Sequence, residues 1–221
     1  MRTTRRRAER GMSLAEVLVG ATLSLIAVAG VYGFHVAQTQ ALAAQRAYAE
    51  SQDVTRTVMD LLARELRMAT YDPSGVAITT SPPGTCPGVK QGIVLAKLDQ
   101  IQFVQDLNGD GDLSDEAEEV YYYALGGELR RVDGGGSALV LTENLDTAGF
   151  LLRYFDNSNP PVELVPSGSP PALTAAQRDC VAKVQITVRA SVENPNPRSD
   201  EPLESLAQAE VAIRNRSLVN F

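Results

Sequence analysis

Oxygen-bearing side chains recur at every second position through the first half of the acidic segment DLNGDGDLSDEAE, which begins at Asp106. Asp106, Asn108 and Asp110 match positions 1, 3 and 5 of a calcium-binding loop, and Gly111 matches position 6, where such a loop turns sharply. Asp112 would add its backbone carbonyl at position 7. Because calcium prefers several oxygen ligands, this spacing predicts that the segment coordinates a calcium ion.

Position 12 of the loop departs from the calcium pattern. Ala117 stands where a bidentate glutamate is expected, and Glu118 is the neighbouring carboxylate that could close the site. The acids of the segment would repel one another without a cation, whereas its strand-like flanks also fit an acidic β-turn that needs no metal. Both interpretations are kept at this stage. The ligands of the calcium interpretation are Asp106, Asn108, Asp110, Asp112 and Glu118.

Composition argues against an enzyme and against a nucleic-acid-binding protein. The chain has one histidine and two cysteines, with no H-E-x-x-H or C-x-x-C motif and no set resembling a Ser/His/Asp or Cys/His site. Residues 1–11 carry five arginines and one glutamate, and the other residues, 15 basic and 26 acidic, carry a net charge of −11. A surface that acidic repels phosphate, so no nucleic-acid partner is expected.

A second chemically unusual residue, Glu16, lies inside an apolar segment. Met12–Val36 holds 25 residues with this single formal charge, and as a helix it would extend about 37 Å, enough to span a membrane. The arginines before it predict a cytoplasmic N-terminus and an exported remainder. An ordinary secretory signal has a shorter apolar segment and a small-residue cleavage site, and a plain signal anchor leaves the costly buried carboxylate unexplained.

The junction R-G-M-S-L-A-E-V-L-V resembles the prepilin leader of type IV pilin-like proteins, which combines basic residues, a glycine, a hydrophobic first mature residue and glutamate at mature position five. The resemblance implies that a prepilin peptidase cleaves after Gly11 and methylates the new amine of Met12, which stands where the family most often has phenylalanine. Positions i and i+4 share a helix face, so Glu16 could pair with the amine of its own chain or of a neighbouring subunit. The family's role for this glutamate is the intersubunit contact that directs assembly.

Two further segments resemble the PilW-like group of minor pilins: Asp60–Tyr71, at a helix end, and Val211–Arg216, at a closing strand. The resemblance implies a subunit that primes or joins a type IV pilus. Its partners would be other pilins, the prepilin peptidase, the inner membrane and a tip adhesin. It would lie in the inner membrane with a periplasmic head before assembly, and in the pilus at the cell surface afterwards. The alternatives are a minor pseudopilin of type II secretion and, more remotely, a signal-anchored periplasmic enzyme or binding domain.

Patterning predicts the elements that would position these residues. Apolar residues recur at spacings of three and four after Val36, and the cluster Tyr71–Gly75 ends the helix. Beyond it, alternating segments predict strands. We therefore expect an α+β type IV pilin-like fold, in which a long N-terminal helix packs on an antiparallel β-sheet. The predicted divisions are a cleaved leader (1–11), a membrane-spanning helix half (12–36), an amphipathic half (37–70) and a β-rich head (71–221).

Both cysteines, Cys86 and Cys180, fall in the predicted exported head. An oxidising compartment favours one structural disulfide between them, and the alternative is two unrelated buried thiols.

Overall fold

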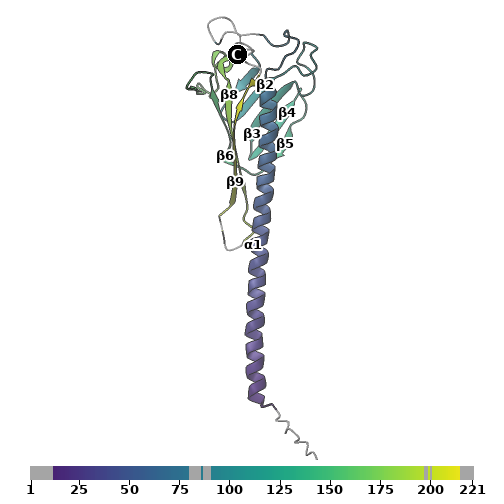
Figure 1. Cartoon of the computed structure of the whole chain (residues 1–221), viewed down its shortest axis with the longest axis vertical. Helices are drawn as coiled ribbons and strands as arrows, with labels where there is room; N and C mark the ends of the chain where they lie inside the picture. Colours follow the sequence, from purple (N-terminus) through teal and green to yellow (C-terminus); the bar gives the residue numbers. More distant parts are fainter. Residues whose placement is uncertain (1–11, 80–85, 87–90, 197–198, 200, 215–221) are drawn as a thin grey trace, which may run out of the picture.

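The computed structural model describes residues 12–79, 86, 91–196, 199 and 201–214. One helix, α1 (Leu14–Met68), runs through 55 residues, and at 1.5 Å per residue it is about 83 Å long. Figure 1 shows its first half projecting away from the β-rich head as a rod, while its second half lies against the head.

The ends of α1 differ from the predicted Met12–Thr70 by two residues each, for local reasons. Ser13 is the N-cap, with extended backbone, so the helix begins at Leu14. Ala69 is the C-cap, and Thr70 adopts a positive φ of 66°, which leaves the α-helical region. The helix is otherwise continuous through its apolar half.

The head contains two antiparallel sheets. The five-stranded sheet has the order β1–β2–β3–β4–β5, and the four-stranded sheet has the order β7–β6–β8–β9. A short helix, α2 (Ala175–Cys180), precedes β8. The strands are β1 (Ile93–Ala96), β2 (Gln100–Val104), β3 (Glu119–Leu125), β4 (Glu128–Asp133), β5 (Leu139–Thr142), β6 (Leu145–Phe155), β7 (Glu163–Leu164), β8 (Lys183–Val192) and β9 (Leu203–Ala212).

The α+β class matches the prediction, but the single expected sheet is in fact two. β5 and β7 are short strands that the alternation did not reveal. Cys180 ends α2, and β8 begins at Lys183. The tight hairpin between β3 and β4 turns at Gly126 and Gly127, whose positive φ glycine adopts without strain.

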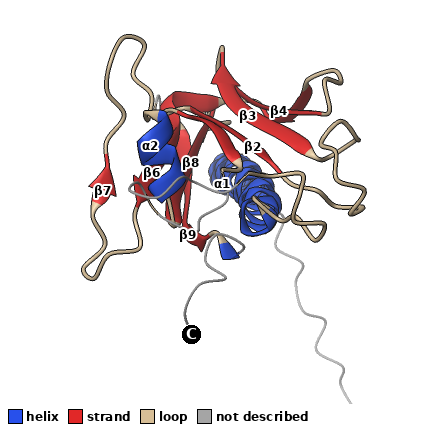
Figure 2. Ribbon diagram, turned by 90° about the horizontal axis from the view of Figure 1, so that it is seen from above, coloured by secondary structure: helices blue, strands red, loops and turns tan. Residues whose placement is uncertain are grey.

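The core lies where α1 meets both sheets, which Figure 2 shows flanking the helix when it is viewed along its axis. Alternate residues of the strands point inward to meet one face of the helix. Nearer the projecting half of α1, the hydroxyls of Ser51 and Thr55 meet the Ser205 hydroxyl of β9 at 2.8 and 3.0 Å. The helix contributes Val58, Met59, Leu62, Ala63 and Leu66 to this core, and the sheets contribute, among others, Phe103, Tyr122, Leu152, Tyr154 and Ile186.

Candidate functional site

The N-terminal part of α1 is an exposed apolar surface. Its most apolar window has a mean hydropathy of 2.1 and none of it is buried against the head. Within the part of the chain that the structure describes, α1 is the one helix long and apolar enough to cross a membrane. Large exposed apolar surfaces on proteins mark contacts with a membrane or with other proteins, and this one is consistent with a signal-anchored membrane protein.

Glu16 lies in the first turn of α1 with its carboxylate turned back toward the start of the helix. One carboxylate oxygen accepts a hydrogen bond from the Ser13 backbone N–H at 2.9 Å, and Ser13 in turn caps the helix through its hydroxyl. Met12 precedes the cap, outside the helix, and is 75% exposed; its pairing with Glu16 after cleavage stays a prediction. The carboxylate nevertheless binds the backbone nitrogen next to Met12. Gly11 lies outside the described residues.

Asp106, the first predicted calcium ligand, is fully buried and organises the acidic loop from within. One oxygen accepts from the Gly109 N–H at 2.6 Å, and the other accepts from the Gly111 N–H at 3.2 Å and the Ser74 hydroxyl at 3.1 Å. Both glycines have positive φ, which supports the prediction of a sharp turn at Gly111. The loop is thereby joined to residue 74, just beyond the end of α1.

The structure brings three exposed carboxylates together at the outer side of this loop. One oxygen from each of Asp110, Asp112 and Asp115 lies within 4.8 Å of the others. The Asn108 amide donates to Asp110 at 3.0 Å and to Asp115 at 2.6 Å. Hydrogen bonds from the Ser114 backbone and hydroxyl lower the pKa of Asp112. Asp115 was missed because the numbering of a helix-flanked calcium loop assigns no ligand to that position.

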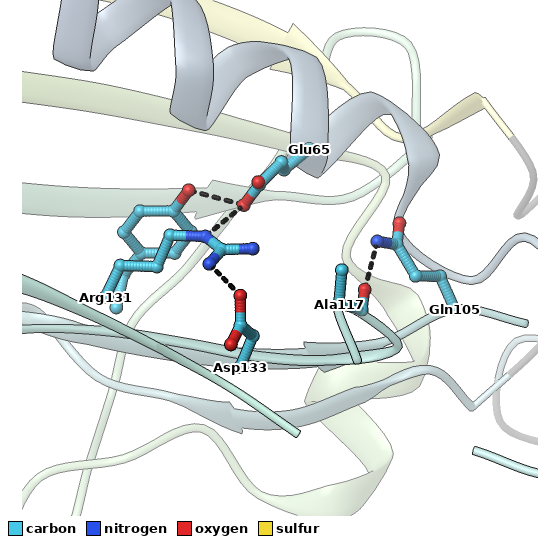
Figure 3. Close-up of polar contacts among 6 residues, drawn as sticks. Glu65, Gln105, Ala117, Arg131 and Asp133 are labelled. Atoms are coloured by element: carbon cyan, nitrogen blue, oxygen red, sulfur yellow. Dashed lines mark hydrogen bonds and ion pairs between the residues drawn. The ribbon is translucent and has the colours of Figure 1, made fainter. Parts of the chain in front are cut away.

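Glu118, the predicted closing ligand, is only 1% exposed. Its Oε1 accepts from the Leu107 N–H at 2.8 Å and the Asn108 N–H at 3.4 Å, so the carboxylate points into the loop. Its Oε2 is buried and, within the described part of the chain, has no hydrogen-bond partner. The Gln105 amide donates to the Ala117 carbonyl at 2.7 Å, which holds the returning end of the loop (Figure 3).

A partly buried polar network that the sequence patterns did not reveal joins α1 to the five-stranded sheet. Glu65 of α1 accepts from the Tyr122 hydroxyl at 2.5 Å and from Arg131 Nε at 3.1 Å, and Arg131 also pairs with Asp133 (Figure 3). Burial, followed by the adjacent Glu65 charge, raises the pKa of Tyr122. Burial alone would lower the pKa of Arg131, but its hydrogen bonds to Glu65 and Asp133 outweigh that effect and raise the pKa above its ordinary value. The signal in the sequence that could have revealed this network is Glu65, a charged residue on the otherwise apolar face of the helix.

The two cysteines predicted to pair form a disulfide, with their Cα atoms 5.4 Å apart. The bond joins residue 86 to the end of α2. Beside it, the buried Asp179 accepts a hydrogen bond from Gln91 at 2.9 Å, so a second contact holds the same region.

Comparisons of the chain with protein-family models, with curated proteins and with solved structures found no match. The fold and these contacts therefore define a class only: an α+β protein with one exposed, membrane-compatible N-terminal helix and a disulfide-bonded head.

Proposed function

We propose that the chain is the precursor of a filament subunit, a minor pilin that primes or joins a type IV pilus after prepilin peptidase cleavage. The observation that supports this most is the division of α1 into two halves. From Ser51 onward one face of the helix is buried in the head, whereas the apolar window of the first half is not buried against any part of the chain that the structure describes. Such a half requires lipid before assembly and other helices after it.

Glu16 supports assembly over simple anchoring. A carboxylate in an apolar helix is costly unless it has a partner, and a plain anchor has no need of one. Glu16 satisfies part of its hydrogen-bonding capacity at the Ser13 N–H, beside the position where cleavage after Gly11 would create an ammonium group on Met12. An ammonium from the same or a neighbouring subunit would neutralise the carboxylate, and the intersubunit pairing would set the register between helices.

The test uses the full chain expressed with its prepilin peptidase. Mass spectrometry of the membrane-purified protein is expected to find Met12 at the N-terminus with one added methyl group. Gly11→Val is expected to leave the leader in place. Glu16→Val is expected to leave cleavage intact but to remove the protein from sheared filaments.

Thr22→Val is the matched control for Glu16→Val, because it also replaces a polar side chain in the same apolar span and Thr22 bonds only the Val19 carbonyl of its own helix. It is expected to process and assemble normally. An uncleaved wild-type chain, or a Glu16→Val chain that enters filaments as wild type does, would contradict the proposal. Co-purification with type IV pili as opposed to secretion pseudopili separates the minor pilin from the minor pseudopilin alternative.

A further inference from the structure

We propose that the loop 106–118 binds one calcium ion, with Glu118 as a ligand from inside the head and the aspartates on the outer side as the others. The observation that carries this is the orphaned Oε2 of Glu118. A buried carboxylate oxygen without a hydrogen-bond donor is costly, and the structure shows one inside a loop that already gathers acids.

Compensation by the protein's own cations is lacking at this loop. Among the described residues, no lysine or arginine forms an ion pair with Asp106, Asp110, Asp112, Asp115 or Glu118. The loop also adjoins the C-terminal end of α1, because Asp106 donates its N–H to the Tyr71 carbonyl at 2.7 Å. A helix C-terminus carries partial negative charge, which adds to the repulsion that a cation would relieve.

Asn108 connects the buried ligand to the exposed ones. Its backbone N–H binds Glu118 Oε1, while its side-chain amide lies between the carboxylates of Asp110 and Asp115. The amide hydrogens thus occupy a position between two anions, where a cation would be stabilised more strongly. Asn108 therefore lies between the carboxylate of Glu118 and those of Asp110 and Asp115.

The donor chemistry selects calcium among biological cations. The cluster offers carboxylate and amide oxygens without histidine or cysteine, which excludes a typical zinc set. Calcium accepts six to eight such oxygens in irregular arrangements, whereas magnesium requires near-octahedral geometry and keeps several waters. An exposed loop that supplies donors from both a buried and an open side suits calcium at the affinities of extracellular modules.

Calcium at this loop would stabilise the junction of helix and head. The loop contacts the end of α1 through the Tyr71 carbonyl and through Ser74, whose hydroxyl bridges Asp72 at 2.7 Å and Asp106 at 3.1 Å. Thr70 donates its N–H to the Val104 carbonyl at 2.9 Å, at the end of the strand that leads into the loop. A bound ion would therefore stabilise the whole head, and its removal would lower the thermal midpoint.

The test is made on the full chain in detergent micelles after chelation and dialysis, and it makes no use of filament assembly. Titration with calcium chloride is followed by calorimetry, and thermal unfolding is measured with and without about 10 mM calcium, where a dissociation constant on the order of 0.1–1 mM gives near-saturation. At ten times that constant the midpoint is expected to rise by about 3–6 °C. Magnesium chloride and sodium chloride at matched ionic strength are expected to have smaller effects.

Two variants test the assigned ligands. Glu118→Gln removes the buried charge, and Asp110→Asn removes an exposed one without disturbing the core; each is expected to weaken calcium binding at least about tenfold. Glu204→Gln, an exposed carboxylate on β9, is the matched control and is expected to bind as wild type. If Glu118→Gln does not fold, calcium binding by Asp110→Asn decides the test. No calcium-dependent rise, an equal rise with magnesium, or unchanged binding in Asp110→Asn would overturn the proposal.

Discussion

The network around Glu65 yields a sharp prediction about how α1 is held on the head. Glu65→Ala removes the acceptor shared by the Tyr122 hydroxyl and Arg131 Nε. The side chains of Glu65 and Arg131 are only 15% and 11% exposed, so water cannot fully replace the lost contacts. The substitution therefore tests a buried interaction between helix and sheet.

The expected loss of unfolding free energy depends on which contacts Tyr122 and Arg131 keep after the substitution. Removing one member of a buried ion pair costs about 3–5 kcal/mol, because the other charge is left uncompensated. Arg131 keeps its pairing with Asp133, which places the cost near the lower end, at about 3 kcal/mol. Alanine's higher helix propensity offsets a few tenths of a kcal/mol. For a chain of this size the thermal midpoint is expected to fall by about 6–12 °C.

The assay is thermal unfolding of the full chain in micelles, monitored by circular dichroism. Glu50→Ala is the matched control, because Glu50 is an exposed glutamate on the same helix; it is expected to change stability by less than about 0.5 kcal/mol. The double variant Glu65→Ala/Arg131→Met is expected to lose less than the sum of the two single variants, since each single variant breaks the same Glu65–Arg131 pair. A Glu65→Ala midpoint equal to that of Glu50→Ala would refute the reasoning.

Two further predictions concern the head. The double variant Cys86→Ser/Cys180→Ser removes a cross-link between residues 94 apart. Its thermal midpoint should fall by an amount equivalent to at most about 4–5 kcal/mol of unfolding free energy. Adding reductant should lower the midpoint of the wild type but not that of the variant. Burial raises the pKa of both Tyr122 and Tyr154 above the ordinary value of about 10, so the stability they contribute is complete below about pH 10 and is lost as pH rises above it. Tyr154→Phe should flatten the fall of the midpoint above about pH 10, whereas a fall as steep as that of wild type would contradict the assignment.

Local patterns in the sequence predicted much of the secondary structure, because periodicity and turn residues act over a few positions. The helix ended two residues before its predicted limit at Thr70, just ahead of the turn cluster Tyr71–Gly75. The short strands β5 and β7 were missed because each is defined by its neighbours in the sheet more than by its own residues. The division into two sheets was missed for the same reason.

The acidic loop also shows that local spacing in the sequence predicts a turn but does not predict which side chains come together. Its spacing predicted a sharp turn at Gly111 and a set of oxygen donors, and the turn is present. Spacing alone assigned the donors by analogy with a helix-flanked loop, and so it omitted Asp115, which the strand-flanked loop brings beside Asp110 and Asp112. Calcium binding itself remains a prediction.

The sequence by itself determined a long amphipathic helix with an apolar, membrane-compatible first half, because both properties depend only on which residue types recur along one segment. Only the tertiary structure decided how that helix is held. The partners of Glu65 are 57 and 66 residues away on two strands, and the donors to Glu118 come from the far end of a turned loop. Contacts between distant residues depend on how the whole chain packs, and no local pattern records them.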